Sequence, residues 1–453
     1  MRSFALHVVS FKLKAILDTF VSRLWPYGLN QERQTRNAKR DEEPMAILAH
    51  TGYAPVLDYI TGFWDRLIRF HPHDTGTLVG LPRPYLVPAT DPQRPLFQEM
   101  YYWDSYFTSL GVIGTSHEWL VLDMAENMAA MVERFGFIPN GNRYYFTSRS
   151  QPPFFTMLIR LAHGIKAARG DTDADEYLRR MMRLAVREHE TCWLGEKHPH
   201  ERRKYRGQSR YHDINYSHFL ASCESGWDHS TRCDGDRPGT EAGLWMDHLP
   251  VCLNSILYAR EVDIAWALGH LGAAGESQYW RGAAEERAAT MRELMWDADK
   301  GYFFDFDWKR EERCSCISLA GFYPLWAGLA TPAQAEEVVS RWLPKFLLPG
   351  GLVTSLDPFP GRQWAYPNGW APLQWLAASG LDRYGFHAEA IEVRKRWCNT
   401  CAHGFTQYGT MLEKYNVAEP HREPEHGVYG LVEGFGWTNG VFVDFVRTLD
   451  RAG

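Results

Sequence analysis

Helical patterns alternate with short loops along most of the chain, and no other feature constrains its fold as strongly. Trp280, Ala284, Ala288, Met291 and Met295 step by four, four, three and four residues, which places them on one face of a helix. Helices are predicted over residues 117–134, 155–190, 250–270, 278–296, 331–343, 371–379 and 386–402. Convincing strand patterns are few and short, so we expect an all-α fold.

One predicted helix has clear boundaries. In "TPAQAEEVV", Thr331 is the expected N-cap, Pro332 occupies the first turn, and Gln334 completes a capping box. The same helix is expected to end before Pro344, because proline cannot donate the backbone hydrogen bond of a helix interior.

The loops between the predicted helices carry the polar and aromatic clusters. These clusters are "YYWDSYF" (101–107), "PNGNRYYFTSRSQPPF" (139–154), "ESGWDHSTR" (224–232), "GYFFDFDW" (301–308), "QWAYPNGWAP" (363–372) and "EKYN" (413–416). Paired helices whose connecting loops converge at one end form an α/α toroid, which places function in loops on a rigid scaffold. No strict sequence repeat is visible, so the closed ring is an inference.

Composition excludes several classes of function. The net charge of −6 argues against a nucleic-acid surface, which needs concentrated Lys and Arg. No uninterrupted apolar stretch reaches the length of a membrane span, so an integral membrane segment is not expected. Aromatic residues make up 14 % of the chain, and rings with a polar tip suit sugars, which have an apolar face and a hydroxylated one.

The cysteines give little sign of a metal centre. Cys314 with Cys316 and Cys398 with Cys401 could be combined into a four-thiolate zinc site. Neither pair lies in a knuckle-like turn, and Cys398 continues a helical pattern, so scattered free thiols are the favoured interpretation. We therefore expect no metal and no cofactor.

The N-terminal residues differ from the rest. Residues 1–45 are basic, and polar residues interrupt their apolar positions, so no continuous core of a secretory signal is visible. We expect a peripheral extension over 1–45, a single catalytic domain over 46–453, and a cytoplasmic location. The sequence leaves the oligomeric state open.

The chain has 55 acidic residues, so many pairs of them are distant enough in sequence to meet the requirements of glycoside hydrolysis. Inverting hydrolysis needs one carboxyl group to protonate the leaving oxygen and a second to activate water from the opposite face. Asp228 in "ESGWDHSTR" and Glu413 in "EKYN" could form such a pair. Each has a plainer alternative: Asp228 as a helix N-cap, and Glu413 as a surface residue beside Lys414.

Several motifs in register resemble family 37 glycoside hydrolases, the α,α-trehalases. The similarity runs from "LPRPYLVP" (81–88) to "FVDFV" (442–446) and includes "YYWDSYF", "PNGNRYYFTSRSQPPF", "ESGWDHSTR", "PNGWAPLQW" and "GFGWTNGV" (434–441). The resemblance implies an (α/α)6 barrel with its active site in the loops at one end. It also implies metal-independent, inverting hydrolysis of a small sugar substrate, most simply of α,α-trehalose to two glucose molecules.

The resemblance also implies roles for individual residues. It assigns Asp228 as the general acid and Glu413 as the general base. The sugar-contacting positions that it implies are Phe97, Tyr101, Trp103, Asp104, Asn140, Arg149, Ser150, Gln151, Gly226, Trp364 and Trp370. Seen without the other motifs, Asn140 could merely shape a turn and Trp103 could be plain core.

Some positions depart from the family pattern. Leu96 stands where an arginine is expected, Ala365 and Asn416 replace aspartates, and Val428 replaces a substrate-binding glutamate. An "RPE" stretch ahead of the acid motif is replaced by "RYHDINYSHF" (210–219). A site that loses hydrogen-bonding partners discriminates against the original substrate. The leaving-group subsite is therefore expected to have diverged, unless Arg94 or Glu425 substitutes for the lost groups.

These departures leave alternative functions open. The substrate could be another small α-glucoside, such as glucosylglycerate. A phosphorylase would need no carboxylate base, which the retention of Glu413 disfavours. A catalytically inactive sugar-binding protein would bind sugar without forming product.

Overall fold

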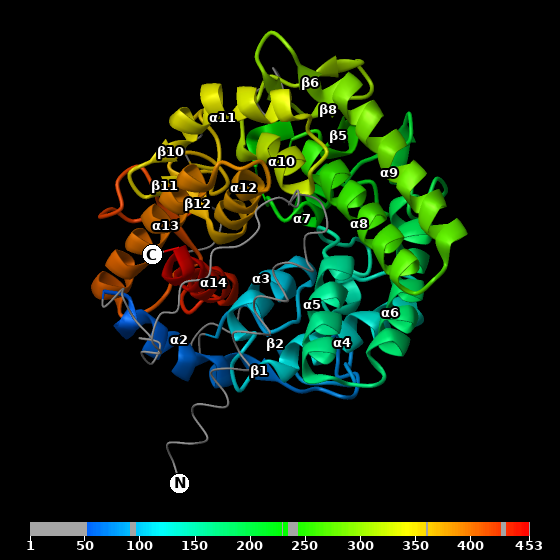
Figure 1. Ribbon diagram of the computed structural model, residues 1–453, viewed down its shortest axis with the longest axis horizontal. Coiled ribbons are helices and arrows are strands. Elements are labelled where there is room, and N and C mark those ends of the chain that lie inside the picture. Colours follow the sequence, from blue (N-terminus) through cyan, green and yellow to red (C-terminus); the bar gives the residue numbers. More distant parts are fainter. Residues whose placement is uncertain are drawn as a thin grey trace, which may run out of the picture.

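The computed structural model describes residues 52–90, 97–228, 230–233, 243–358, 361–426 and 432–452. The predicted extension over 1–45 lies outside these residues, as do Arg94, Leu96 and Val428. Most of the described chain is helical (Figure 1).

Six helices form a closed inner ring within the described residues. They are α3 (Tyr102–Val112), α5 (Phe155–Arg169), α8 (Val251–His270), α10 (Tyr323–Ala327), α12 (Ala371–Arg383) and α14 (Gly436–Ala452). Each packs against the next, and α14 packs against α3, so that the last inner helix closes the ring onto the first (Figure 1).

A second layer of helices surrounds this ring (Figure 1). It consists of α2 (Ala54–Leu67), α4 (Trp119–Phe135), α6 (Ala174–Glu188), α9 (Ala274–Met295), α11 (Pro332–Phe346) and α13 (His387–Tyr408). A short helix, α7 (His218–Glu224), lies in the long connection between α6 and α8. The expected all-α fold, an (α/α)6 barrel, is confirmed.

The strands are short antiparallel pairs in the connections. They are β1 (Ile68–Arg69) with β2 (Tyr85–Leu86), β3 (Arg203–Tyr205) with β4 (Gln208–Ser209), β6 (Trp296–Asp297) with β7 (Tyr302–Phe303), β10 (Leu347–Leu348) with β11 (Gly351–Leu352), and β12 (Asn368–Trp370) with β13 (Lys414–Asn416). A three-stranded sheet contains β5 (His248–Leu249), β8 (Phe306–Asp307) and β9 (Glu312–Arg313). Their role is local, since none spans the molecule.

Glycines bring the first and last inner helices into close contact. A Cβ atom at Gly111 in α3 would lie 2.7 Å from the Cα of Gly440 in α14. A Cβ at Gly440 would in turn collide with the backbone of Phe107. Because only hydrogen occupies these positions, the two backbones can pack closely enough to close the ring.

Burial explains why the sequence pattern missed α3. Every residue of α3 is buried, so this helix has no polar face and lacks the periodicity of an amphipathic helix. Its first residues were assigned to the loop cluster 101–107, and this assignment is wrong because α3 begins at Tyr102. The outer helix α6, by contrast, has polar and apolar faces.

Two predicted helix boundaries are also wrong. The stretch 155–190 is two helices, because Gly170 takes a left-handed conformation with φ of 76° and ends α5. The helix from Pro332 continues past Pro344 to Phe346, since a proline so near the C-terminus removes a hydrogen bond only in the last turns. The capping box between Thr331 and Gln334 is confirmed.

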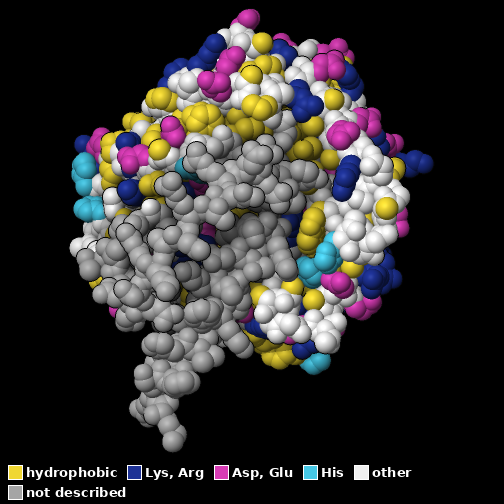
Figure 2. Space-filling model, in the orientation of Figure 1, with side chains coloured by type: hydrophobic (Ala, Val, Ile, Leu, Met, Phe, Trp, Pro, Cys, Tyr) yellow, Lys and Arg dark blue, Asp and Glu magenta, His cyan; other side chains and the backbone are white. Residues whose placement is uncertain are grey.

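Charges of both signs are mixed on the described part of the surface that Figure 2 draws. On the face drawn in Figure 2, Lys and Arg are interspersed with Asp and Glu wherever the atoms are described. Within the described residues, no helix has both the length and the apolar character that crossing a bilayer requires.

Candidate active site

A cavity of about 210 Å³ lies where several inner helices begin. Trp103 and Asp104 occupy the first turn of α3, Trp437 is in the first turn of α14, and Trp370 directly precedes α12. Helix N-termini present free N–H groups and the positive end of the helix dipole. This end of the ring is therefore suited to bind oxygen-rich or negatively charged groups.

The cavity collects nearly every predicted site residue. Its walls contain Phe97, Tyr101, Trp103, Asp104, Asn140, Arg149, Gln151, Gly226, Asp228, Trp364, Trp370 and Glu413. Ser150 does not line it, because the Ser150 hydroxyl is buried and donates to the carbonyl of Ile138 at 2.6 Å. Ser150 thus contributes to the shape of the loop between Arg149 and Gln151.

Four lining residues were not among the predicted contacts. They are Phe146, Cys223, Phe435 and Trp437. Phe146 lies within "PNGNRYYFTSRSQPPF", while Phe435 and Trp437 lie within "GFGWTNGV", so these motifs contained the signal. Nothing in the sequence pattern distinguishes Cys223 from the other thiols.

Asp228 lies on a tight turn that packs against an indole. Gly226 has φ of 71°, and a Cβ there would lie 2.6 Å from Cζ2 of Trp103. A glycine is therefore required two residues before the acid, both for the backbone conformation and for the contact. The side chain of Asp228 lines the cavity, and in the short helix that follows it is Ser230 Oγ that accepts from the Arg232 backbone N–H, at 3.3 Å.

The environment of Asp228 favours its protonated form. Burial raises the pKa of Asp228 to about 7, because removing a carboxylate from water penalises its charge. Arg149 acts in the opposite direction, and the negative charge of Glu413 adds to the increase in pKa. A carboxyl group with a pKa near 7 can donate a proton at neutral pH.

Glu413 is buried, which makes the surface alternative wrong. It is 1 % exposed, and Lys414 beside it is fully buried. Lys414 Nζ donates to Glu413 Oε2 at 2.8 Å, and Trp437 Nε1 donates to the Glu413 carbonyl at 3.1 Å. These two hydrogen bonds fix the position of the Glu413 side chain and backbone at the cavity.

Asp104 is a third carboxyl group in the cavity. Burial is the largest cause of its raised pKa, and the charges of Glu413 and Asp228 increase it further. Three carboxyl groups therefore lie within electrostatic range of one another. Gln151 hydrogen-bonds with Asp104 and accepts from the Trp103 backbone N–H at 3.2 Å, which fixes both side chains.

Indole rings form one wall of the cavity. The rings of Trp364 and Trp370 are parallel, with centroids 3.8 Å apart, and Trp227 stacks on Trp364 at 5.3 Å. Trp437 meets Trp103 and Trp370 edge to face. This wall excludes water, which explains the desolvation that acts on Asp228 and Asp104.

Two buried ion pairs hold the acid turn. Glu224 accepts from the backbone N–H groups of Ser150 at 2.5 Å and His212 at 2.7 Å, and it pairs with Arg202. It therefore joins the Arg149–Gln151 loop to the segment that carries Asp228.

Arg232, the arginine at the end of "ESGWDHSTR", has a structural role. It forms a forked ion pair with Asp305, and its guanidinium lies 4.7 Å from the Trp227 ring centroid.

Asn140 and Arg149 complete the polar side of the cavity. Asn140 Nδ2 donates to the carbonyls of Ser150 at 3.1 Å and Cys223 at 3.3 Å, so this residue connects two loops as well as lining the cavity. Within the described residues, Nε of Arg149 is buried without a hydrogen-bond partner. Such a donor is suited to a ligand oxygen.

The residues that depart from the family pattern and are described in the structure do not line the cavity. Asn416 accepts from the backbone N–H groups of Ala418 and Glu419, which an aspartate would also do. Ala365 is fully buried, and Glu425 is exposed with its backbone bonded to Asn368. Among the described residues, Glu425 is therefore not a replacement for a lost cavity group.

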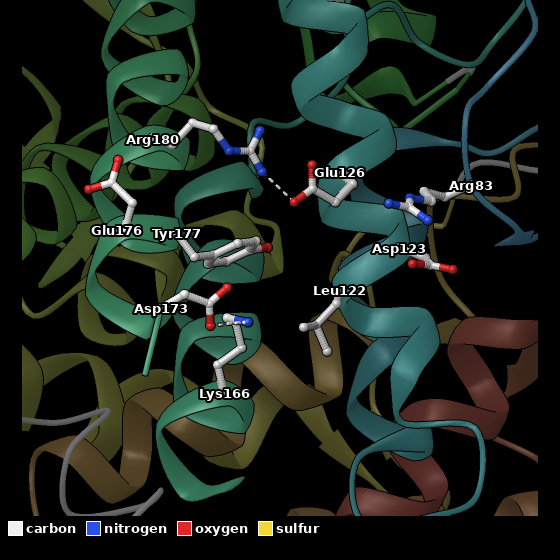
Figure 3. Close-up of a pocket in the computed structure, with 9 residues that line it drawn as sticks. All are labelled: Arg83, Leu122, Asp123, Glu126, Lys166, Asp173, Glu176, Tyr177 and Arg180. Carbon is white, nitrogen blue, oxygen red and sulfur yellow. Dashed lines mark hydrogen bonds and ion pairs between the residues drawn. The ribbon is translucent and has the colours of Figure 1, made fainter. Parts of the chain in front are cut away.

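A second hollow, of about 380 Å³, lies between α4 and α6 on the outer layer (Figure 3). It is larger than the inner cavity but contains no group of converging acids and indoles. Four of its charged residues form two ion pairs: Lys166 with Asp173 at 2.9 Å, and Arg180 with Glu126. We therefore place the chemistry in the inner cavity.

The four-thiolate zinc alternative fails within the described residues. The one group of potential metal ligands there is His163, Asp175 and His270, which includes no cysteine. All eight cysteines are free thiols.

Comparisons with known proteins agree with the geometry. The Trehalase family profile matches residues 10–215 and 200–450. A periplasmic trehalase from Xanthomonas campestris is 33 % identical over 418 residues, covering 85 % of this chain and 72 % of that protein. The neutral trehalase from Saccharomyces cerevisiae is 28 % identical with a TM-score of 0.70, covering 86 % of this chain and 79 % of the other.

A more distant structure shares the fold alone. The GH63 mannosylglycerate hydrolase from Thermus thermophilus in complex with glucose is 19 % identical with a TM-score of 0.63. It covers 87 % of this chain and all of that one.

The comparisons contradict the expected cytoplasmic location. That expectation rested on the lack of a continuous apolar run in residues 1–45. The lack of a recognisable signal pattern does not by itself establish a location. The relative from Xanthomonas campestris, which is similar over most of the chain, is a periplasmic protein.

Proposed function

The chain belongs to the trehalase family, and from that premise we propose that it hydrolyses α,α-trehalose with inversion at one anomeric carbon. In this proposal Asp228 is the general acid and Glu413 is the general base. The observation that carries it is the meeting of these two acids, from distant segments, in one buried cavity.

The acid step follows from the environment of Asp228. With its pKa raised to about 7, the carboxyl group is protonated in a large share of the molecules at neutral pH, and this protonated form gives its proton to the glycosidic oxygen as the C–O bond breaks. The leaving glucose departs as a neutral alcohol. Arg149 orients oxygens near this carboxyl, because its guanidinium donates and does not itself act as an acid.

In the base step, Glu413 activates the attacking water molecule. Its carboxylate removes a proton from a water molecule, whose oxygen attacks the anomeric carbon from the opposite face. Lys414 Nζ donates to Glu413 Oε2 at 2.8 Å, which orients this carboxyl group. Asp104 and Gln151 are placed to hydrogen-bond ring hydroxyls, and the Trp364–Trp370 wall supports the apolar face of the sugar.

The stereochemistry of the product tests this function. Inversion of α,α-trehalose releases one glucose as the β anomer and the leaving glucose as the α anomer. Proton NMR during the first minutes should therefore show equal amounts of the two anomers before mutarotation. Release of α-glucose alone would contradict inversion.

Substitution of each carboxyl group tests the assigned residues. Asp228→Asn and Glu413→Gln should each lower kcat on trehalose by at least ~10²-fold, the scale of general acid–base catalysis. Normal turnover in either variant would overturn the assignment. Glucosylglycerate is the comparison substrate, and a preference for it over trehalose would indicate an altered leaving-group subsite.

A further inference from the structure

A group of potential metal ligands lies on three different helices. His163 is in α5, Asp175 in α6 and His270 is the last residue of α8. One ligand atom from each lies within 4.8 Å of the others. Nε2 of His163 is 3.3 Å from Asp175 Oδ1, and Nε2 of His270 is 2.9 Å from the same oxygen. The three helices pack against one another, as Figure 1 shows.

The distances between these ligand atoms fit the edges of the tetrahedron that ligands form around a zinc ion. A zinc ion takes nitrogen and oxygen ligands at about 2.0–2.2 Å in a tetrahedron, which separates neighbouring ligand atoms by about 3.3 Å. The two nitrogen–oxygen distances are close to that length. The third edge joins the two imidazole nitrogens, which lie within 4.8 Å of each other, so side-chain rotation would complete the shell.

The surroundings hold the imidazoles in place. The ring of Trp266 stacks on His270 with a centroid distance of 5.7 Å and meets His163 edge to face at 6.0 Å. The guanidinium of Arg160 lies over the ring of Trp266. Arg160 also pairs with Asp263 at 2.6 Å, so its positive charge is compensated. Groups that orient ligands strengthen metal binding, because less freedom is lost when the ion arrives.

Neighbouring charges leave Asp175 available. Lys166, one turn beyond His163, pairs with Asp171 at 3.1 Å and with Asp173 at 2.9 Å. It is not paired with Asp175.

We propose that His163, Asp175 and His270 bind one divalent transition-metal ion that ties α5, α6 and α8 together. Two imidazoles and one carboxylate favour zinc, nickel, cobalt or copper over calcium and magnesium, which prefer oxygen ligands. Asp175 and His270 are exposed, so water completes the coordination shell.

The position of this site makes its role structural. The N-terminus of α8 lies near the active site, because the Val251 N–H donates to Asp305, which pairs with Arg232 behind the acid turn. His270 is at the other end of α8, which is 20 residues long and therefore about 30 Å away. The ion would stabilise the fold without taking part in sugar chemistry.

Calorimetry on the full chain tests this proposal. After chelation and dialysis, titration with zinc chloride should show one more high-affinity equivalent for the wild type than for His270→Ala or Asp175→Asn. His387→Ala is the matched control, since His387 pairs with Asp382 at 3.0 Å on the surface without a second histidine. It should bind as much zinc as the wild type.

Thermal unfolding gives the second measurement. Zinc at a hundred times its Kd should raise the Tm of the wild type by about 3 °C, as expected for a chain of this size. Calcium should have no effect, and neither variant should respond to zinc. Equal zinc binding in the wild type and both variants, an equal response to calcium, or no zinc binding at all would each overturn the proposal. Unchanged turnover of trehalose in His270→Ala excludes misfolding as the cause of lost binding.

Discussion

The clearest test of the acid turn is Gly226→Ala. Residue 226 has φ of 71°, and an alanine in this left-handed region costs about 1–2 kcal/mol. The new Cβ would also lie 2.6 Å from Cζ2 and 2.7 Å from Cε2 of Trp103. Carbon atoms prefer separations of about 3.5–4.0 Å, so the turn and the indole must move apart by roughly 1 Å.

The expected loss follows from this displacement. Asp228 lies two residues after the glycine, and an error of about 1 Å in a catalytic geometry can cost ~10²-fold in rate. Overpacking adds about 1–3 kcal/mol to the backbone cost, so the free energy of unfolding should fall by about 2–5 kcal/mol. The two assays are kcat/KM on trehalose and chemical unfolding.

Gly170→Ala is the matched control. Gly170 has φ of 76°, ends α5, and has no atom within 4 Å of the added Cβ. This variant should lose only the backbone cost of about 1–2 kcal/mol and keep its activity. Wild-type kcat/KM in Gly226→Ala, or an equal loss in Gly170→Ala, would refute the reasoning.

Three further predictions concern the same site. Because the proposed acid must be protonated and the pKa of Asp228 is raised to about 7, kcat/KM on trehalose should fall as the pH rises through about 7; a profile that stays flat to high pH would contradict this. Glu224→Ala should lower the free energy of unfolding by about 3–5 kcal/mol, since Arg202 would stay buried without its partner; denaturant titration measures this, and a loss below about 1 kcal/mol would be contrary evidence. Asn416→Asp should leave kcat/KM nearly unchanged, because residue 416 bonds backbone groups outside the cavity; a large change in trehalose kinetics would show that it affects the sugar site.

The sequence predicted outer helices such as α9 and α11 but missed the inner helix α3, for a physical reason. Outer helices such as α9 and α11 have one buried and one exposed face, so apolar residues recur with the period of a helix. Helix α3 is buried on all sides: Asp104 lines the cavity, and the hydroxyls of Ser105 and Ser109 donate to backbone carbonyls inside the fold. Periodicity therefore could not distinguish α3 from a loop.

The prediction of the site residues depended on the family motifs more than on the spacing of residues. No pattern in the sequence could bring Asp228 and Glu413 together, since many acidic residues offer such pairs; the resemblance selected these two. Phe435 and Trp437 were within a recognised motif but were not assigned to the cavity. The group formed by His163, Asp175 and His270 left no local signal, because its members come from three helices.

A crystal structure with glucose or trehalose bound tests the central claim most directly. The quantity to measure is the distance between the carboxyl groups of Asp228 and Glu413 on either side of the anomeric carbon. We expect about 6.5–9.5 Å, which leaves room for the attacking water. A separation of about 5–5.5 Å would indicate a retaining enzyme, and a sugar that touches neither carboxyl group would contradict the mechanism.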